Sequence, residues 1–199
     1  MTPRQTPAAQ QLRHQMEQFV ALTDGDWGLL EPHLTVSVIK KHELFAQEGL
    51  VSGEVGFVIE GMFRQFYTKD GDERTTYFYF EYHFLSAYIS CLTGKPSLVT
   101  IEALSDSTYI SFPYTVLHGL FEQHMVWQKF GRLIAEYLTI GLEERMASLL
   151  LLSPEERYLH LLEGTKKKIL ERVPQHYIAN CLGITPVSMS RIRNRILRK

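Results

Sequence analysis

The sequence lacks several features that would point to particular classes of protein. Its 199 residues include only two cysteines, Cys91 and Cys181, which are far apart and belong to no CxxC pair. Two thiols cannot supply the four ligands of an iron–sulfur cluster. The eight histidines form no HxxxH or HExxH pattern. We therefore assign no metal site and no catalytic residue.

Long apolar runs are also missing. No stretch approaches the roughly 18 apolar residues of a membrane span, and the opening MTPRQTPAAQQ has no apolar run typical of a signal peptide. We expect a cytoplasmic protein without a membrane partner. The composition, 45% hydrophobic and 12% aromatic, is typical of a globular protein with a substantial core.

The C-terminal stretch 174–199, PQHYIANCLGITPVSMSRIRNRILRK, has the spacing of a helix-turn-helix. Gly183 suits the left-handed residue that ends a first helix, and Thr185 followed by Pro186 suits the N-cap and first residue of a second. In the second helix, apolar residues recur at intervals of three and four and should face inward. These residues are Met189, Ile192 and Ile196.

The opposite face of the second helix is rich in hydrogen-bond donors. They are Ser188, Ser190, Arg191, Asn194, Arg195 and Arg198. Such donors fit phosphate oxygens and base edges, and arginine can bridge O6 and N7 of guanine. Residues 166–199 hold nine Lys or Arg against one acid, a net charge of +8, whereas the whole chain is −1, which leaves −9 for residues 1–165. A basic tail on an acidic body favours a DNA recognition helix over the alternative, an ordinary basic hairpin.

The order of patterns along the chain predicts an α+β fold. An amphipathic helix over about 5–22 is followed, between about 35 and 112, by short strand patterns separated by tight turns, which are typical of an antiparallel jelly roll. A long helix follows without proline until about 152, and Ser153-Pro154-Glu155-Glu156 caps a new helix. We expect three units: 1–112 with the β-roll, a dimerisation helix over 113–152, and an all-α DNA-binding domain over 153–199.

The long helix carries a heptad-like seam in a 3-4-3-4 rhythm. Its residues are Trp127, Phe130, Ile134, Tyr137 and Gly141. A helix of this length has more apolar surface than a compact barrel should cover, so we expect it to pair with its copy in a homodimer. The alternative is an ordinary core helix.

Taken together, these segments resemble the CRP/FNR family of bacterial transcription regulators over nearly the entire chain. The resemblance rests on IKKHELFAQEG (39–49), FVIEGMFRQFY (57–67), SPEERYLHLLE (153–163) and VPQHYIANCLGITPVSMSRIRN (173–194). It implies a cyclic-nucleotide-binding-like β-roll, a winged helix-turn-helix domain and no enzymatic activity. It also implies a homodimer that reads a pseudopalindrome in double-stranded DNA and contacts RNA polymerase.

The resemblance assigns roles to residues of the second helix. Thr185 and Ser188 match residues that contact phosphates, whereas Pro186, Val187 and Arg191 match residues that face bases. Pro186 and Val187 cannot make polar base contacts through their side chains, so the target sequence need not resemble the family's best-known sites. The expected DNA-binding surface also includes Gln175, Asn194 and Arg195.

The effector site departs from the family pattern. Members that bind cyclic nucleotides supply a Gly-Glu pair for the ribose and an Arg followed by Ser or Thr for the cyclic phosphate. Here Glu81 lacks the glycine, and Lys95-Pro96-Ser97 stands where the arginine pair would be. The expected pocket residues are Glu81, Phe84, Ser86, Lys95 and Ser97. Three possibilities stay open: a cyclic nucleotide in the usual mode, another small molecule suited to the aromatic cassette, or a filled roll that needs no ligand.

Two other functions are compatible with this pattern. A small-molecule or cyclic-nucleotide sensor could act mainly through protein contacts, with the C-terminal helices as a vestigial tail. A jelly-roll enzyme would need converging histidines, and His83, His118 and His124 lack that spacing.

Overall fold

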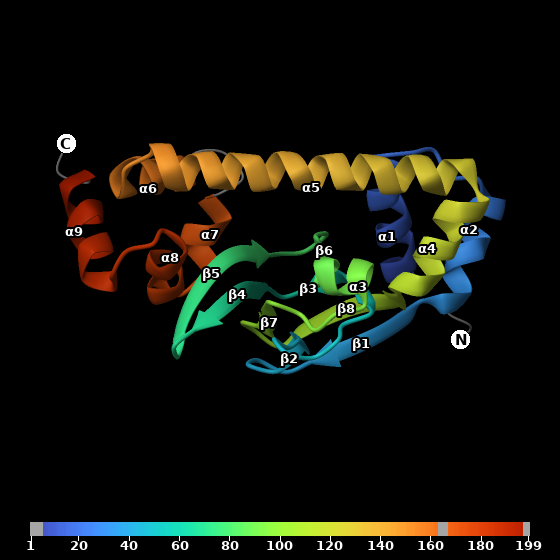
Figure 1. Cartoon of the computed structure of the whole chain (residues 1–199), viewed down its shortest axis with the longest axis horizontal. Helices are drawn as coiled ribbons and strands as arrows, with labels where there is room; N and C mark the ends of the chain where they lie inside the picture. The colour runs from blue at the N-terminus through green and yellow to red at the C-terminus, as the bar shows by residue number, and fades with distance from the viewer. Residues whose placement is uncertain (1–5, 163–166, 197–199) are drawn as a thin grey trace.

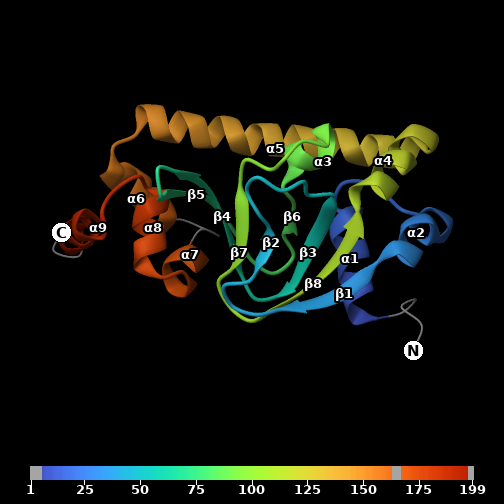
Figure 2. The same cartoon turned by 60° about the horizontal axis from the view of Figure 1, so that its bottom comes forward.

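The computed structural model describes residues 6–162 and 167–196. It is elongated: helix α5 runs along the length of the molecule, from the N-terminal helices at one end to the C-terminal helices at the other, with the strands beside it (Figures 1 and 2). The helices before the strands are α1 (Pro7–Glu17), α2 (Asp24–Leu30) and the short 3-10 helix η2 (Glu31–His33).

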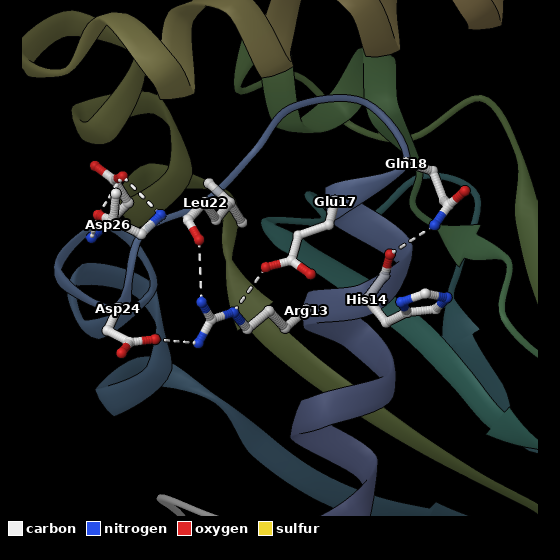
Figure 3. Close-up of polar contacts among 8 residues, drawn as sticks. Arg13, His14, Glu17, Gln18, Leu22, Asp24 and Asp26 are labelled. Atoms are coloured by element: carbon white, nitrogen blue, oxygen red, sulfur yellow. Dashed lines mark hydrogen bonds and ion pairs between the residues drawn. The ribbon is translucent and has the colours of Figure 1, made fainter.

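The two N-terminal helices are tied together by Arg13. Its guanidinium donates to Glu17 Oε1 at 2.9 Å, to Asp24 Oδ1 at 2.8 Å and to the carbonyl of Leu22 at 3.0 Å (Figure 3). The pair therefore forms one unit, whose apolar side chains Leu12, Met16, Trp27 and Leu30 are buried.

The strands form the predicted jelly roll of two four-stranded antiparallel sheets. One sheet has the order β1 (Thr35–Ile39), β8 (Ser107–Pro113), β3 (Glu54–Glu60), β6 (Phe84–Leu85). The other has the order β2 (Leu44–Ala46), β7 (Thr100–Ala103), β4 (Phe63–Lys69), β5 (Asp72–Tyr79). A short helix, α3 (Tyr88–Thr93), lies between β6 and β7 in sequence.

The turn between β3 and β4 needs a glycine. Gly61 has φ +103°, and a Cβ there would lie 2.1 Å from Ser107 Oγ and 2.9 Å from Ser107 Cα. A side chain would therefore meet backbone as well as strain its own conformation.

The long helix begins with a break that the sequence pattern did not predict. His124 has extended backbone angles (φ −132°, ψ 121°), which separate α4 (Tyr114–Gln123) from α5 (Met125–Leu151). The first turns of α5 lie beside the N-terminal helices (Figure 1).

The predicted dimer seam is wrong at its N-terminal end. Trp127 and Phe130 are buried in the chain's own core, where the Phe130 ring lies 5.8 Å from Phe19 and 6.4 Å from Phe84. Ile134 is partly buried against the same core, whereas Tyr137 and Gly141 are exposed. The prediction compared the helix with the roll alone and missed the cover that the N-terminal helices provide.

The C-terminal unit consists of α6 (Pro154–Leu162), α7 (Lys167–Arg172), α8 (Gln175–Cys181) and α9 (Pro186–Ile196). The part of it that the structure describes contains no strand, so the β-hairpin of a winged domain is not found there. Instead, KKILER, which is rich in helix-forming residues, adopts a helix before α8.

We expect Phe130→Ala to lower the free energy of unfolding by about 3–5 kcal/mol, because it leaves a cavity among Phe19, Phe84 and Trp127. Urea denaturation would measure the loss. Val38→Ala, at an exposed position of β1, should change stability by less than about 0.5 kcal/mol. A Phe130→Ala loss as small as that of Val38→Ala would contradict the core assignment.

Candidate nucleic-acid interface

Helices α8 and α9 form a helix-turn-helix. Gly183 adopts φ +72° after α8, and the N–H of Ile184 donates to the carbonyl of Ala179 at 3.0 Å. Thr185 then caps α9, because its Oγ1 accepts from the N–H of Ser188 at 3.2 Å. The predicted inward residues Met189 and Ile192 are buried, and they pack with the apolar side of α8.

Most residues of the predicted DNA-binding surface lie on the solvent side of these two helices. Gln175, Thr185, Pro186, Val187, Arg191, Asn194 and Arg195 are exposed. Ser188 is half-buried, and its hydroxyl lies 3.0 Å from Thr185 Oγ1. Arg195 also pairs with Glu155 of α6 at 2.7 Å. The face that carries Arg191 is therefore turned outward.

Two arginines that the sequence reasoning missed hold the C-terminal end of α8. Arg145 of α5 donates to the carbonyl of Cys181. Arg157 of α6 donates to the carbonyls of Leu182 at 2.9 Å and Leu152 at 2.7 Å. These donors satisfy carbonyls that a helix end leaves without partners. No sequence signal distinguishes them from other helical arginines.

The opposite side of α8 contacts strand β5 of the roll. Asn180 Oδ1 accepts from the N–H of Thr75 at 2.5 Å, and Asn180 Nδ2 donates to the carbonyl of Glu73 at 2.7 Å. Nearby, Arg172 of α7 makes two bonds to the carboxylate of Glu81, at 2.6 and 2.7 Å.

Glu81 therefore does not belong to an effector pocket, contrary to the sequence prediction. Its carboxylate faces Arg172 and also accepts from the N–H of Gly61 at 3.3 Å. The hydrogen bonds from Arg172 lower the pKa of Glu81 to about 2, whereas partial burial opposes this shift.

The other expected pocket residues do not converge either. Phe84 packs against Phe57 with ring centroids 5.3 Å apart, and Ser86 Oγ donates to the carbonyl of Glu54 at 3.2 Å. Ser97 is buried, and its hydroxyl bonds the backbone of Val99. Lys95 is exposed on the loop after α3. These side chains complete the core and the local turns, so they do not line one cavity.

The interior of the roll is filled by apolar and aromatic side chains from both sheets. They are Ile39, Ala46, Val58, Phe63, Tyr79, Leu85, Ala87, Val99, Ile101 and Ala103, with Phe45 and Tyr109 packed against them. Burial raises the pKa of Tyr79, whose hydroxyl donates to Gln65 Oε1 at 2.7 Å.

A hollow of about 580 Å³ lies on the outer face of the sheet that holds β4 and β7. Its walls include Arg64, Glu102 and Tyr177. Arg64 is only 3% exposed, and its guanidinium is 2.6 Å from both Glu102 and Glu73. It also contacts the rings of Phe66 at 4.1 Å and Tyr177 at 4.0 Å. The Arg64 guanidinium is thus a buried charge on the outer face of the sheet.

Comparison with known proteins shows which folds this architecture resembles. Residues 36–124 match the cyclic nucleotide-binding domain family. This segment of the chain is similar to a cyclic nucleotide-binding domain. Around this domain, the chain has the fold of the CRP/FNR regulators. The structure of FixK2 from Bradyrhizobium japonicum matches with a TM-score of 0.68 at 19% identity, over 83% of this chain and 85% of that chain.

Two further solved structures share the fold. A putative transcriptional regulator of the CRP/FNR family from Eubacterium rectale has a TM-score of 0.68 at 18% identity, covering 88% of this chain and 84% of that one. The catabolite activator protein of Thermus thermophilus has a TM-score of 0.57 at 19% identity, covering 92% and 87%. No curated protein matches the sequence.

The residues of this cyclic nucleotide-binding domain do not fit a cyclic nucleotide in the family's mode. A cyclic phosphate in a water-excluded site needs a cation beside it. Within residues 79–104, which correspond to the phosphate-binding segment of the family, the only Lys or Arg is Lys95, which is exposed. The hydroxyl of Ser97 already donates to the carbonyl of Val99. Arg64 is buried but already paired, on the other face of the sheet.

Other classes of site are not found in the described part of the chain. Among residues 6–162 and 167–196, no group of three or more His, Cys, Asp or Glu side chains is arranged to hold a metal ion. No helix in these ranges is long and apolar enough to cross a membrane.

The Glu81–Arg172 pair predicts a pH dependence. The folded-state pKa of Glu81 is about 2, below its ordinary value of 4.5, so ionised Glu81 stabilises the fold above about pH 4.5. This contribution is lost as the pH falls toward 2. The stability difference between the wild type and Glu81→Gln should therefore shrink over this range, as measured by urea denaturation at each pH. In an Arg172→Gln background, the stability difference caused by Glu81→Gln should have little pH dependence. The same pH dependence with and without Arg172 would contradict the Glu81–Arg172 ion pair as its cause.

Proposed function

We propose that the protein is a DNA-binding transcriptional regulator of the CRP/FNR type, in which α9 is the recognition helix. The observation that carries this proposal is the outward, donor-rich face of α9, with Thr185 capping the helix and Arg191 exposed. A helix N-terminus and an exposed arginine suit phosphate and base contacts in a major groove. The +8 charge of residues 166–199 supports the same function.

In this proposal the regulator acts as a homodimer. Its dimer contact is a stripe of α5 whose residues differ from those of the seam predicted from the sequence. Leu138, Leu142, Met146 and Leu149 are exposed and follow one another at intervals of four, four and three residues. This spacing places them on one face of the helix. Exposed apolar residues in a continuous row are typical of a surface that a second helix covers.

The regulator works without a cyclic nucleotide in the family's mode, because the interior of the roll is filled and its buried cation is paired on the outer face. Double-stranded DNA and a second copy are its proposed partners. The resemblance also implies RNA polymerase as a partner, cytoplasmic location and no catalytic activity.

The first test is DNA binding itself. The wild type should select a pseudopalindromic duplex from a random library, protect it in a footprint, and bind it with an affinity that falls steeply with salt. Arg191→Ala should reduce the preference for that duplex by roughly 5–150-fold, the equivalent of about 1–3 kcal/mol for one base contact.

The matched control for this change is Arg132→Ala, which removes the same charge from α5 instead of α9. It should leave the preference unchanged. Equal protection of all duplexes by the wild type would contradict the proposed function. Weak binding that does not depend on salt would favour a sensor that acts through protein contacts.

The second test concerns the dimer. Leu142→Asp should give monomers in light scattering, because it places a charge within the apolar stripe. Ile140→Asp is the matched control. Ile140 is 60% exposed and Leu142 is 72% exposed, but residues two apart lie on nearly opposite sides of a helix. Ile140→Asp should stay dimeric, and dimeric Leu142→Asp would contradict the stripe.

A further inference from the structure

We propose that the outer edge of strand β5 is an internal docking site for the DNA-binding unit, and that Asn180 and Arg172 are positioning residues that orient α9 for DNA. The inference rests on the proposed function. Strand β5 sets the position of the recognition helix without a ligand in the roll.

Strand β5 is the last strand of its sheet, so one side of its backbone has no strand partner. Such an edge presents N–H and C=O groups that need hydrogen bonds. Asn180 supplies both, since its carboxamide accepts from the N–H of Thr75 and donates to the carbonyl of Glu73. A side-chain amide that bonds residues i and i+2 in this way substitutes for a neighbouring strand. An amide is suited to this because it combines an acceptor and a donor.

One turn before Asn180 on α8, Tyr177 covers the buried guanidinium of Arg64. The Tyr177 ring lies 4.0 Å from the Arg64 guanidinium and the Phe66 ring 4.1 Å from it, while Glu73 and Glu102 accept the hydrogen bonds of the guanidinium. A buried charge is costly unless it is fully compensated. Departure of α8 would remove one face of this enclosure, so the contact favours the docked position.

The rest of the contact has the composition of a protein interface. Phe78, Phe80 and Leu104 of the roll share one buried cluster with Val173, Ile178 and Leu182 of the DNA-binding unit. The Arg172–Glu81 pair lies at its rim, with the guanidinium 5.3 Å from the Phe80 ring. An apolar centre with charged pairs around it fixes both the affinity and the register of a docked unit.

This docking has a direct consequence for DNA recognition. Two recognition helices must lie about one helical turn of DNA apart to enter successive grooves. With each unit held against its own roll, their separation follows from the dimer contact alone. An undocked unit would populate many orientations, and its apparent affinity would fall in proportion to the competent fraction.

The decisive experiment reverses one charge at the rim. Glu81→Arg places a cation beside Arg172, and we expect affinity for the selected duplex to fall about tenfold or more, as it would if the docked fraction fell to about one tenth. The double variant Glu81→Arg/Arg172→Glu restores the ion pair with opposite polarity and should recover most of the affinity. Fluorescence anisotropy at fixed salt measures all three proteins.

The matched control is Asp106→Lys. It reverses a charge in the exposed Lys40–Asp106 pair of the roll and changes net charge by the same amount as Glu81→Arg. It should leave the affinity within about twofold of the wild type, which separates docking from long-range electrostatics. An unchanged or higher affinity of Glu81→Arg, or no recovery in the double variant, would overturn the inference.

A second measurement tests the docking without DNA. Because the Thr75 amide donates to Asn180, it should be protected from hydrogen exchange in the wild type and lose protection in Asn180→Ala. A wild-type Thr75 amide that exchanges like an open amide would overturn the docking. Protection in a wild type that selects no DNA site would instead contradict the proposed function and leave the docked contact intact.

Discussion

The structure depends on the division of α5 into a buried half and an exposed half. Its first turns carry Trp127 and Phe130 into a core that also contains the N-terminal helices and the β3–β8 side of the roll. This packing fixes the direction of the helix. Its later turns, beyond that core, carry the apolar stripe and Arg145, which reaches the end of α8. One rigid element therefore connects the fold's core, the proposed dimer contact and the C-terminal unit.

The second constraint is that the C-terminal unit shares its core with the roll. Helices α6 to α9 are short, and their buried side chains complete a cluster with Phe78, Phe80 and Leu104 from the roll. A unit this small gains much of its stability from the surface on which it packs. The position of the unit and the stability of the unit are therefore linked, so a change at the β5 edge affects both.

Local sequence signals predicted much of this architecture. Thr185 with Pro186, Gly183 and the inward Met189 and Ile192 defined the helix-turn-helix because caps and periodicity act over a few residues. The jelly roll was also predicted correctly, although the short strand β6 was not predicted. The predictions failed where contacts between residues far apart in the sequence determine burial or pairing. The burial of Phe130 depends on packing against Phe19, and the pairing of Glu81 depends on Arg172, 91 positions away. The break at His124 carries no glycine or proline to announce it.

The filled roll changes how such a fold can work. In place of a ligand cavity, the interior holds Tyr79, Tyr109, Phe63 and their apolar neighbours. Dense packing of this kind resists partial rearrangement.

The hydrogen bonds that Asn180 of α8 makes to the edge of strand β5 also have a consequence for solubility. A strand edge without partners is a template for pairing with the strands of other molecules, and natural proteins cover or charge such edges. Here the C-terminal unit covers the edge. Release of that unit would expose a hydrogen-bonding edge beside Phe78 and Phe80. Release of the C-terminal unit from β5 would then cause both the loss of the proposed regulation and aggregation through the sheet.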